Sequence, residues 1–151
     1  MLLRDDTPKA TEWVLDNGCT NHMTGDMNLL TDAPLTPSHL KHITYANKGK
    51  SKVLGLGKVA ISKDRHMEKV MLVESLGYNL MSASMLCDLD MVVVFGKYHC
   101  VVIMEDDNSK VFEGFRRGDL YIVDFSTGPQ PAGCLLAEAS EGWLRHRHLV
   151  M

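Results

Sequence analysis

The apolar residues of this chain fall into short runs, each bounded by Gly, Asn, Asp or Lys. With their flanking residues, these runs form segments of four to six residues. Segments of this length are usual for β-strands and too short for most helices. Many short strands within about 100 residues favour a barrel or a sandwich. We predict eight strands: Glu12–Leu15, Ile43–Ala46, Lys52–Leu56, Lys58–Ser62, Lys69–Val73, Val92–Phe95, His99–Met104 and Leu120–Phe125.

One segment has helical periodicity instead. Within Asn79–Leu89 the apolar side chains recur on one helical face, and Asn79 precedes them as a cap. We therefore predict one helix there and a shorter helical turn within Asn21–Leu30. A hairpin tip is predicted at Asn47-Lys48-Gly49-Lys50, because Gly49 can adopt a positive φ.

Composition and charge narrow the class of protein. With 151 residues and 45% hydrophobic composition, the chain suits one compact domain plus an appendage. A net charge of −3 gives no indication of a nucleic-acid or membrane partner, and no apolar run approaches the roughly 20 residues of a membrane span. The acidic N-terminal segment lacks a signal-peptide core, and the four scattered cysteines are typical of free thiols. We expect a cytoplasmic or nuclear protein that is not secreted.

The run Trp13-Val14-Leu15 leads directly into Asp16-Asn17-Gly18. These three residue types are common in any tight turn, so an ordinary loop is one explanation. The other explanation is catalytic, because a carboxylate beside a buried strand is costly unless its charge has a role. A predicted hairpin follows over Ile43–Leu56, and an apolar strand with a polar helix start comes later. That order of parts is the layout of one half of a retropepsin.

Several motifs carry a closer resemblance. The stretch WVLDNGCTNHMTGD resembles a Trp-x-Leu-Asp-Ser-Gly motif followed by His-Met-Thr-Gly, and VLGLGKVAI, VESLGYNLMSASMLCDL, VFEGFRRGDLYIVDF and GWLRHRHL continue the likeness. The family is the copia-type retrotransposon Pol polyprotein, at its protease segment and the start of its pre-integrase segment. The resemblance implies a mainly β, retropepsin-like (acid protease) closed β-barrel with one short helix and a C-terminal strand and tail extension. It divides the chain into a protease domain, 1–104, and a truncated pre-integrase-like extension, 105–151.

The resemblance also implies a mechanism. Aspartic proteases use two carboxylates that share one proton: one activates a water as base, and the protonated one hydrogen-bonds the scissile carbonyl. Because the chain has a single Asp-x-Gly, a complete site requires a homodimer with Asp16 of each copy on the two-fold axis, supported by Asn17 and Gly18. No cofactor or metal is implied. The hairpin is the expected substrate-binding flap, with the tip residues Ala46, Asn47, Lys48, Gly49 and Lys50.

Asn17 departs from the family pattern, which has Ser or Thr with a hydroxyl that braces the two Asp loops. The bulkier amide cannot make the same compact hydrogen bonds. A small displacement of the two carboxylates strongly lowers the rate of catalysis. Two functions therefore stay open. The first is a homodimeric aspartic endopeptidase acting on peptides. The second is a catalytically inactive, host-recruited protein–protein interaction module. The start of the chain at its own Met and its end inside the pre-integrase motif favour this second hypothesis.

Other groups of residues suggest zinc or nucleic acid. Cys19, His22, His39 and His42 could form a tetrahedral zinc site, but the resemblance already places the first two around the active-site loop. His146 matches the first ligand of the pre-integrase zinc motif, while His148 shares no helix face with it. Lys48, Lys50 and Lys52 lack interleaved aromatic residues, so a solvated hairpin edge is favoured over nucleic acid. We expect neither metal nor nucleic acid.

Overall fold

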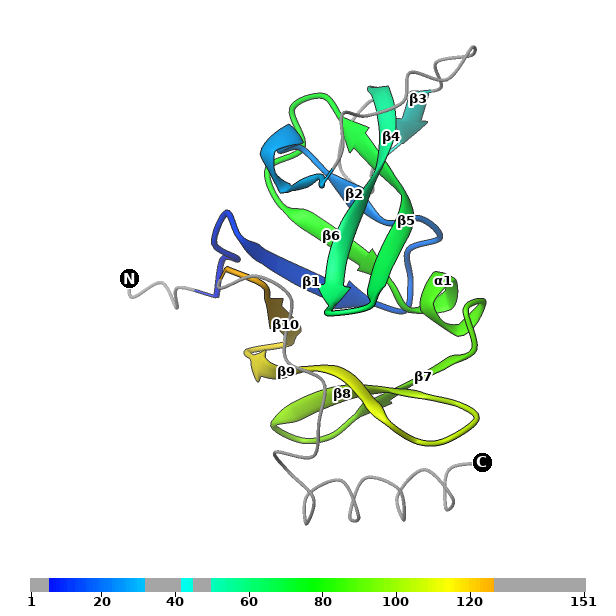
Figure 1. Cartoon of the computed structure of the whole chain (residues 1–151). Coiled ribbons are helices and arrows are strands. Elements are labelled where there is room, and N and C mark those ends of the chain that lie inside the picture. The colour runs from blue at the N-terminus through cyan, green and yellow to red at the C-terminus, as the bar shows by residue number, and fades with distance from the viewer. Residues whose placement is uncertain (1–5, 32–41, 45–49, 127–151) are drawn as a thin grey trace, which may run out of the picture.

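The computed structural model describes residues 6–31, 42–44 and 50–126, which form one sheet of ten strands (Figure 1). Its order is β3-β4-β5-β2-β6-β1-β10-β9-β8-β7. Two short helices join the strands: the 3-10 turn η1 (Met27–Leu29) and α1 (Ala83–Cys87). The strands are β1 (Glu12–Asp16), β2 (Met23–Thr24), β3 (His42–Thr44), β4 (Lys50–Ser62), β5 (Arg65–Val73), β6 (Asn79–Ser82), β7 (Met91–Phe95), β8 (His99–Met104), β9 (Lys110–Arg117) and β10 (Leu120–Asp124).

The sheet curls so that its two halves share one core. Trp13 and Leu15 of β1 lie in the same buried cluster as Met67 of β5 and Phe112 of β9. The prediction of a mainly β, barrel-like fold is confirmed, although within the described residues β3 and β7 are unpaired edges and the barrel is not closed. None of the helices described is long and apolar enough to span a membrane.

Most predicted strands are confirmed, with different ends. His99–Met104 is confirmed to the residue. Lys52–Leu56 and Lys58–Ser62 are one continuous strand, β4, whose register against β5 shifts at Gly57/Val59. The sequence pattern did not predict β9, whose Gly114 interrupts the apolar alternation. That glycine is required by close packing, because a β-carbon there would clash with the Ile122 carbonyl oxygen and the Cys100 sulfur.

The helix prediction over Asn79–Leu89 is wrong in its first turn. Asn79–Ser82 is strand β6, and α1 begins only at Ala83, capped by the Ser82 side chain, which accepts from the Met85 N–H. The apolar pattern of the segment was real, but β6 pairs in parallel with β1, with Val14 opposite Leu80 and Asp16 opposite Ser82. Tertiary pairing outweighs helix propensity here.

The segment predicted as the start of a C-terminal extension contributes to the same sheet. β10 pairs antiparallel with β1, with Trp13 opposite Val123, and β9 pairs with both β10 and β8. The division of the chain into 1–104 and 105–151 stays a prediction. Residues 127–151, including His146 and His148, lie outside the described residues.

The buried side-chain amide of Asn79 fixes β6 against the neighbouring strands. Its nitrogen donates hydrogen bonds and its oxygen accepts one. Its Nδ2 donates to the carbonyl oxygens of Ala10 and Glu12, both at 2.9 Å. Its Oδ1 accepts from the Thr24 hydroxyl at 2.6 Å. The predicted role of Asn79 as a helix cap is therefore wrong, because its side chain joins the start of β1 to the end of β2.

A buried ion pair also links β1 to β9 across the sheet. Glu12 has a side chain only 4% exposed and forms two hydrogen bonds of 2.8 Å with the Arg117 guanidinium. These hydrogen bonds hold the pKa of the Glu12 carboxyl below its usual value, although burial acts in the opposite direction; the Lys9 backbone N–H contributes as well. Charge-assisted, bidentate pairs of this kind stabilise the fold and also fix the relative positions of the two side chains.

Asn79→Ala should lower the free energy of unfolding by about 3 kcal/mol, because it removes the buried acceptor of the Thr24 hydroxyl and the amide donor to the Ala10 and Glu12 carbonyl groups. Urea denaturation followed by circular dichroism measures this loss. Asn28→Ala, at an exposed site in η1, is the matched control and should stay within about 0.5 kcal/mol of the wild type. Equal losses in the two variants would contradict the assigned role of Asn79.

The Glu12–Arg117 pair should make stability depend on pH. Because folding lowers the pKa of Glu12, its contribution is complete above the ordinary carboxyl range and is lost as the pH falls through the folded value. We expect Glu12→Gln to cost about 2 kcal/mol at pH 7, and the difference between variant and wild type to shrink on acidification to about pH 3. Denaturation midpoints of both proteins at a series of pH values test this. A difference in stability that stays constant with pH would show that ionisation of Glu12 is not its source.

Candidate active site

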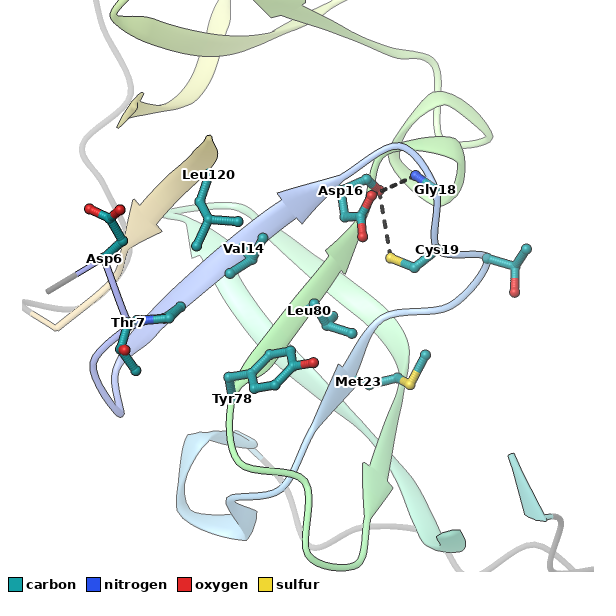
Figure 2. A pocket seen from close by; sticks show the side chains of 12 residues that line it. Asp6, Thr7, Val14, Asp16, Gly18, Cys19, Met23, Tyr78, Leu80 and Leu120 are labelled. Atoms are coloured by element: carbon teal, nitrogen blue, oxygen red, sulfur yellow. Dashed lines mark hydrogen bonds between the residues drawn. The ribbon is translucent and has the colours of Figure 1, made fainter. Parts of the chain in front are cut away.

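Asp16 is the last residue of β1 and follows four buried residues, so the core fixes the position of its backbone. Its Oδ1 accepts a hydrogen bond of 2.7 Å from the Gly18 N–H, and the Cys19 thiol donates to its carbonyl oxygen at 3.6 Å (Figure 2). A β-carbon at Gly18 would lie 3.1 Å from Asp16 Oδ1, tighter than ordinary contact. The turn therefore holds the carboxylate in place, and glycine suits its third position.

Two buried side chains hold the Asp16–Cys19 loop from behind. Ser82, fully buried at the end of β6, donates from its hydroxyl to the Cys19 carbonyl oxygen at 2.8 Å. Its backbone N–H donates to Nδ1 of His22 at 2.9 Å. The Ser82 side chain thus fixes the end of the loop, and its backbone N–H fixes His22, three residues after the loop.

His22 is a structural residue at this site. It is 1% exposed, and burial lowers the pKa of its imidazole to about 4. The ring is therefore neutral at physiological pH and accepts the Ser82 N–H. The zinc alternative needs His22 as a ligand, but its Nδ1 is occupied, and the described part of the chain contains no cluster of three potential ligands. His39 lies outside that part, and of His42 only the backbone is described.

The Asp16 carboxylate opens onto an apolar groove of about 780 Å³. The groove passes over the face of β1, β6 and β2 that lies opposite the core, where Val14, Leu80 and Met23 line it (Figure 2). Tyr78, 46% exposed, stands beside Leu80. A smaller hollow of about 290 Å³ brings Asp16 and Asn17 together with Phe95, Leu120 and Tyr121. The loop therefore lies between two concave surfaces.

The three residues of the predicted catalytic turn differ in their surroundings. Asp16 is half-buried, while Asn17 and Gly18 are exposed. The Asn17 side chain makes no hydrogen bond to any described residue. Each chain brings one Asp16 to this loop, so the structure of a single chain leaves the catalytic roles of Asp16, Asn17 and Gly18 as predictions.

The predicted flap is described only in its two arms. β3 pairs antiparallel with β4, with His42 opposite Lys52 and Thr44 opposite Lys50. This register is the base of a hairpin, as predicted. Lys50 begins β4. Of the predicted tip, Ala46, Asn47, Lys48 and Gly49 lie outside the described residues, so the role of the flap stays a prediction.

Sequence patterns did not identify Ser82, Tyr78 or Leu80 as parts of the site. The apolar spacing predicts Ser82 within a helix, and only the parallel register of β6 with β1 places it behind the Asp16 loop. The groove residues carry no chemical signature, because apolar side chains on a strand are assigned to the core by default.

Comparisons with known proteins point to a family. A family model described as Pol polyprotein, beta-barrel domain matches residues 13–91, a range that begins within β1 and includes the Asp16 loop, β6 and α1. No curated protein and no solved structure matched the chain.

The hold of Ser82 on the Asp16 loop can be tested through Cys19. Burial, and secondarily the Asp16 charge, raise the pKa of the Cys19 thiol to about 11, so wild-type Cys19 should react slowly with iodoacetamide at pH 8. Ser82→Ala frees the Cys19 carbonyl and should speed this alkylation by about tenfold, because local opening then costs about 1.4 kcal/mol less. Peptide mass spectrometry measures the rate at Cys19 separately from the other thiols.

Ser84→Ala is the matched control for this experiment. Ser84 is exposed, and its hydroxyl contacts Ser82 at 3.0 Å without touching the loop. This variant should leave the alkylation rate of Cys19 close to the wild-type rate. A rate unchanged in Ser82→Ala would show that Ser82 does not hold the loop.

Proposed function

Because the chain belongs to the Pol polyprotein β-barrel domain family, we propose that it is the retropepsin-like protease segment of a copia-type retroelement and one half of an aspartic endopeptidase. The observation that carries this proposal is the position of Asp16. Its carboxylate ends a buried strand, is fixed by the Gly18 N–H, and opens onto an apolar groove of about 780 Å³. A carboxylate held in this way is suited to acid–base chemistry on a bound peptide.

The catalytic unit is a homodimer. A single carboxylate cannot act as general base and hold the proton that polarises the scissile carbonyl at the same time. Two copies of Asp16 on a two-fold axis share one proton, since two like charges about 3 Å apart cannot both ionise. Asn17 and Gly18 then lie next to the axis, where Asn17, exposed and without a hydrogen bond to the described chain, faces its symmetry mate.

The substrate is an extended peptide with apolar residues at the cut. Val14, Met23 and Leu80 give the groove an apolar floor, and Tyr78 adds an aromatic edge with a hydroxyl. The hairpin formed by β3 and β4 covers the bound peptide and excludes water from the reacting carbonyl. The strands that would bind substrate thus present mostly apolar side chains, while the polar groups of the groove lie at the Asp16 loop and at Asp6 and Thr7.

Asn17 supports a second candidate function. Its amide stands where the resembled family has a hydroxyl, and the chain makes no use of that amide in the described part. If the two loops cannot close around the bulkier side chain, the groove remains as an apolar binding surface. The alternative is therefore an inactive protein–protein interaction module that binds a peptide or protein partner through the same groove.

Proteolysis at acidic pH tests the first function. The wild-type protein should cleave an unfolded protein between apolar residues, and Asp16→Asn should lose at least about a hundredfold in rate because it removes the acid–base group. Asp64→Asn, in the exposed turn between β4 and β5, is the matched control and should keep wild-type activity. Mass spectrometry of the products gives both the rate and the cleavage sites.

Asn17→Ser separates the two functions further. If only the hydroxyl brace is missing, this change should raise the cleavage rate above the wild-type rate, and Asp16→Asn should abolish the gain. If neither wild type nor Asn17→Ser cleaves any unfolded substrate, the endopeptidase proposal fails. In that case the Asp16→Asn variant should still bind a partner in the groove, whereas the Leu80→Asp variant should not.

A further inference from the structure

Within the part of the chain that the structure describes, strand β7 is an edge of the sheet that lacks the usual protections. Natural edge strands are short, charged, bulged or interrupted by proline, which prevents another strand from pairing with them. The sequence of β7, Met-Val-Val-Val-Phe, has no charge and no proline. Its pairing with β8 runs without a register shift from Met91/Met104 to Phe95/Cys100. The opposite edge, β3, is only three residues long.

The hydrogen-bond pattern shows which backbone groups face the open edge. Gly96 donates to the His99 carbonyl and Glu105 donates to the Asp90 carbonyl, so the even-numbered residues of β7 bond to β8. In an antiparallel ladder the alternate residues then point their N–H and C=O away from the partner strand. Met91, Val93 and Phe95 therefore present a row of backbone donors and acceptors that no described residue satisfies.

The edge is also accessible. A hollow of about 400 Å³ follows it, lined by Met91, Val92 and Val93 together with Cys87 of α1. At the other end of the strand, Phe95 lines the hollow of about 290 Å³ beside Asn17. In Figure 1 β7 lies with β8 at the end of the sheet farthest from β3 to β5. Among the described residues, hollows thus border β7 at both of its ends.

We propose that this edge pairs with β7 of a second copy of the chain, antiparallel and centred on Val93, so that the two sheets become continuous. The central residue belongs to the outward-facing set, so Val93 of each copy would exchange both backbone hydrogen bonds with its symmetry mate. The same register sets Met91 opposite Phe95 in both directions. Every outward group of the strand then has a partner.

Charge favours a second copy over an unrelated peptide. The start of β7 is acidic, with Asp88 and Asp90 just before it, whereas Lys97 follows its end. Antiparallel self-pairing brings the acidic start of each copy next to the basic end of the other. The strand itself is apolar and uncharged, so no like charges meet along the interface. This interface does not rest on Asp16, and it stands whether or not the protein cleaves peptides.

Val93→Pro tests the pairing, because it removes an outward-facing N–H and no hydrogen bond within the chain; proline is tolerated on edge strands. Light scattering across a concentration series should show that the mass of the wild-type assembly, a multiple of the 16.9 kDa chain, falls by half in the variant. Val93→Thr keeps the N–H and should retain the wild-type mass. A monomeric wild type, or a Val93→Pro variant with wild-type mass, would overturn the proposal; the second outcome leaves an Asp16-centred dimer intact.

Val93→Cys gives a test that does not depend on tolerance of proline. In the proposed register the two Cα atoms at position 93 are about 5.5 Å apart, within the range that a disulfide spans. Mild oxidation should therefore produce a dimer with a disulfide between the two copies of position 93, identified by peptide mapping. Val92→Cys, one residue away on the opposite face, should give no such link. Equal cross-linking at both positions, or none at position 93, counts against the pairing.

Discussion

The arrangement of the site depends on the insertion of β6 between β1 and β2, parallel to β1 and antiparallel to β2. A parallel neighbour places strand ends that are distant in sequence at the same end of the sheet, and here it brings Ser82 beside Asp16. The insertion buries polar groups, and each has a partner: Asn79 bonds to Thr24, Ala10 and Glu12, and Ser82 bonds to the Asp16–Cys19 loop. Buried polar groups without partners would instead oppose this topology.

The same constraint explains the form of the candidate site. The Ser82 hydroxyl bonds to the loop at the Cys19 carbonyl, and His22 accepts the Ser82 N–H. The Asp16 carboxylate accepts from Gly18 and faces the groove. Ser82 also begins α1, so one residue ends the strand, caps the helix and holds the loop. Fixing a reactive group on rigid elements is what preorganised catalysis requires. The loop has that rigidity in one chain; in the proposed endopeptidase the second carboxylate would come from another copy.

The sequence predicted the elements that depend on local pattern, and missed those that depend on pairing. Both ends of His99–Met104 were predicted correctly because its apolar run has sharp polar limits. Asn79–Ser82 was assigned to a helix because its apolar spacing continues into α1, and no local signal shows a parallel partner at a distant position in the chain. Asp16 was identified as a candidate from its strand-to-turn context, which is local. The groove, Ser82 and the open edge of β7 follow only from the order of strands in the sheet.

The most direct test of the central claim, that two Asp16 loops meet, is the distance between the two copies of position 17 in solution. Asn17 is exposed and makes no hydrogen bond within the described chain, so Asn17→Cys can carry a nitroxide label once Cys87 and Cys134 are replaced by Ser. Pulsed electron-spin measurements on this protein should give a single short distance, well below the diameter of one chain, and it should persist in the Val93→Pro background. A long distance, or no spin–spin interaction at concentrations where the protein is dimeric, would show that the loops do not meet and that each chain holds an isolated carboxylate.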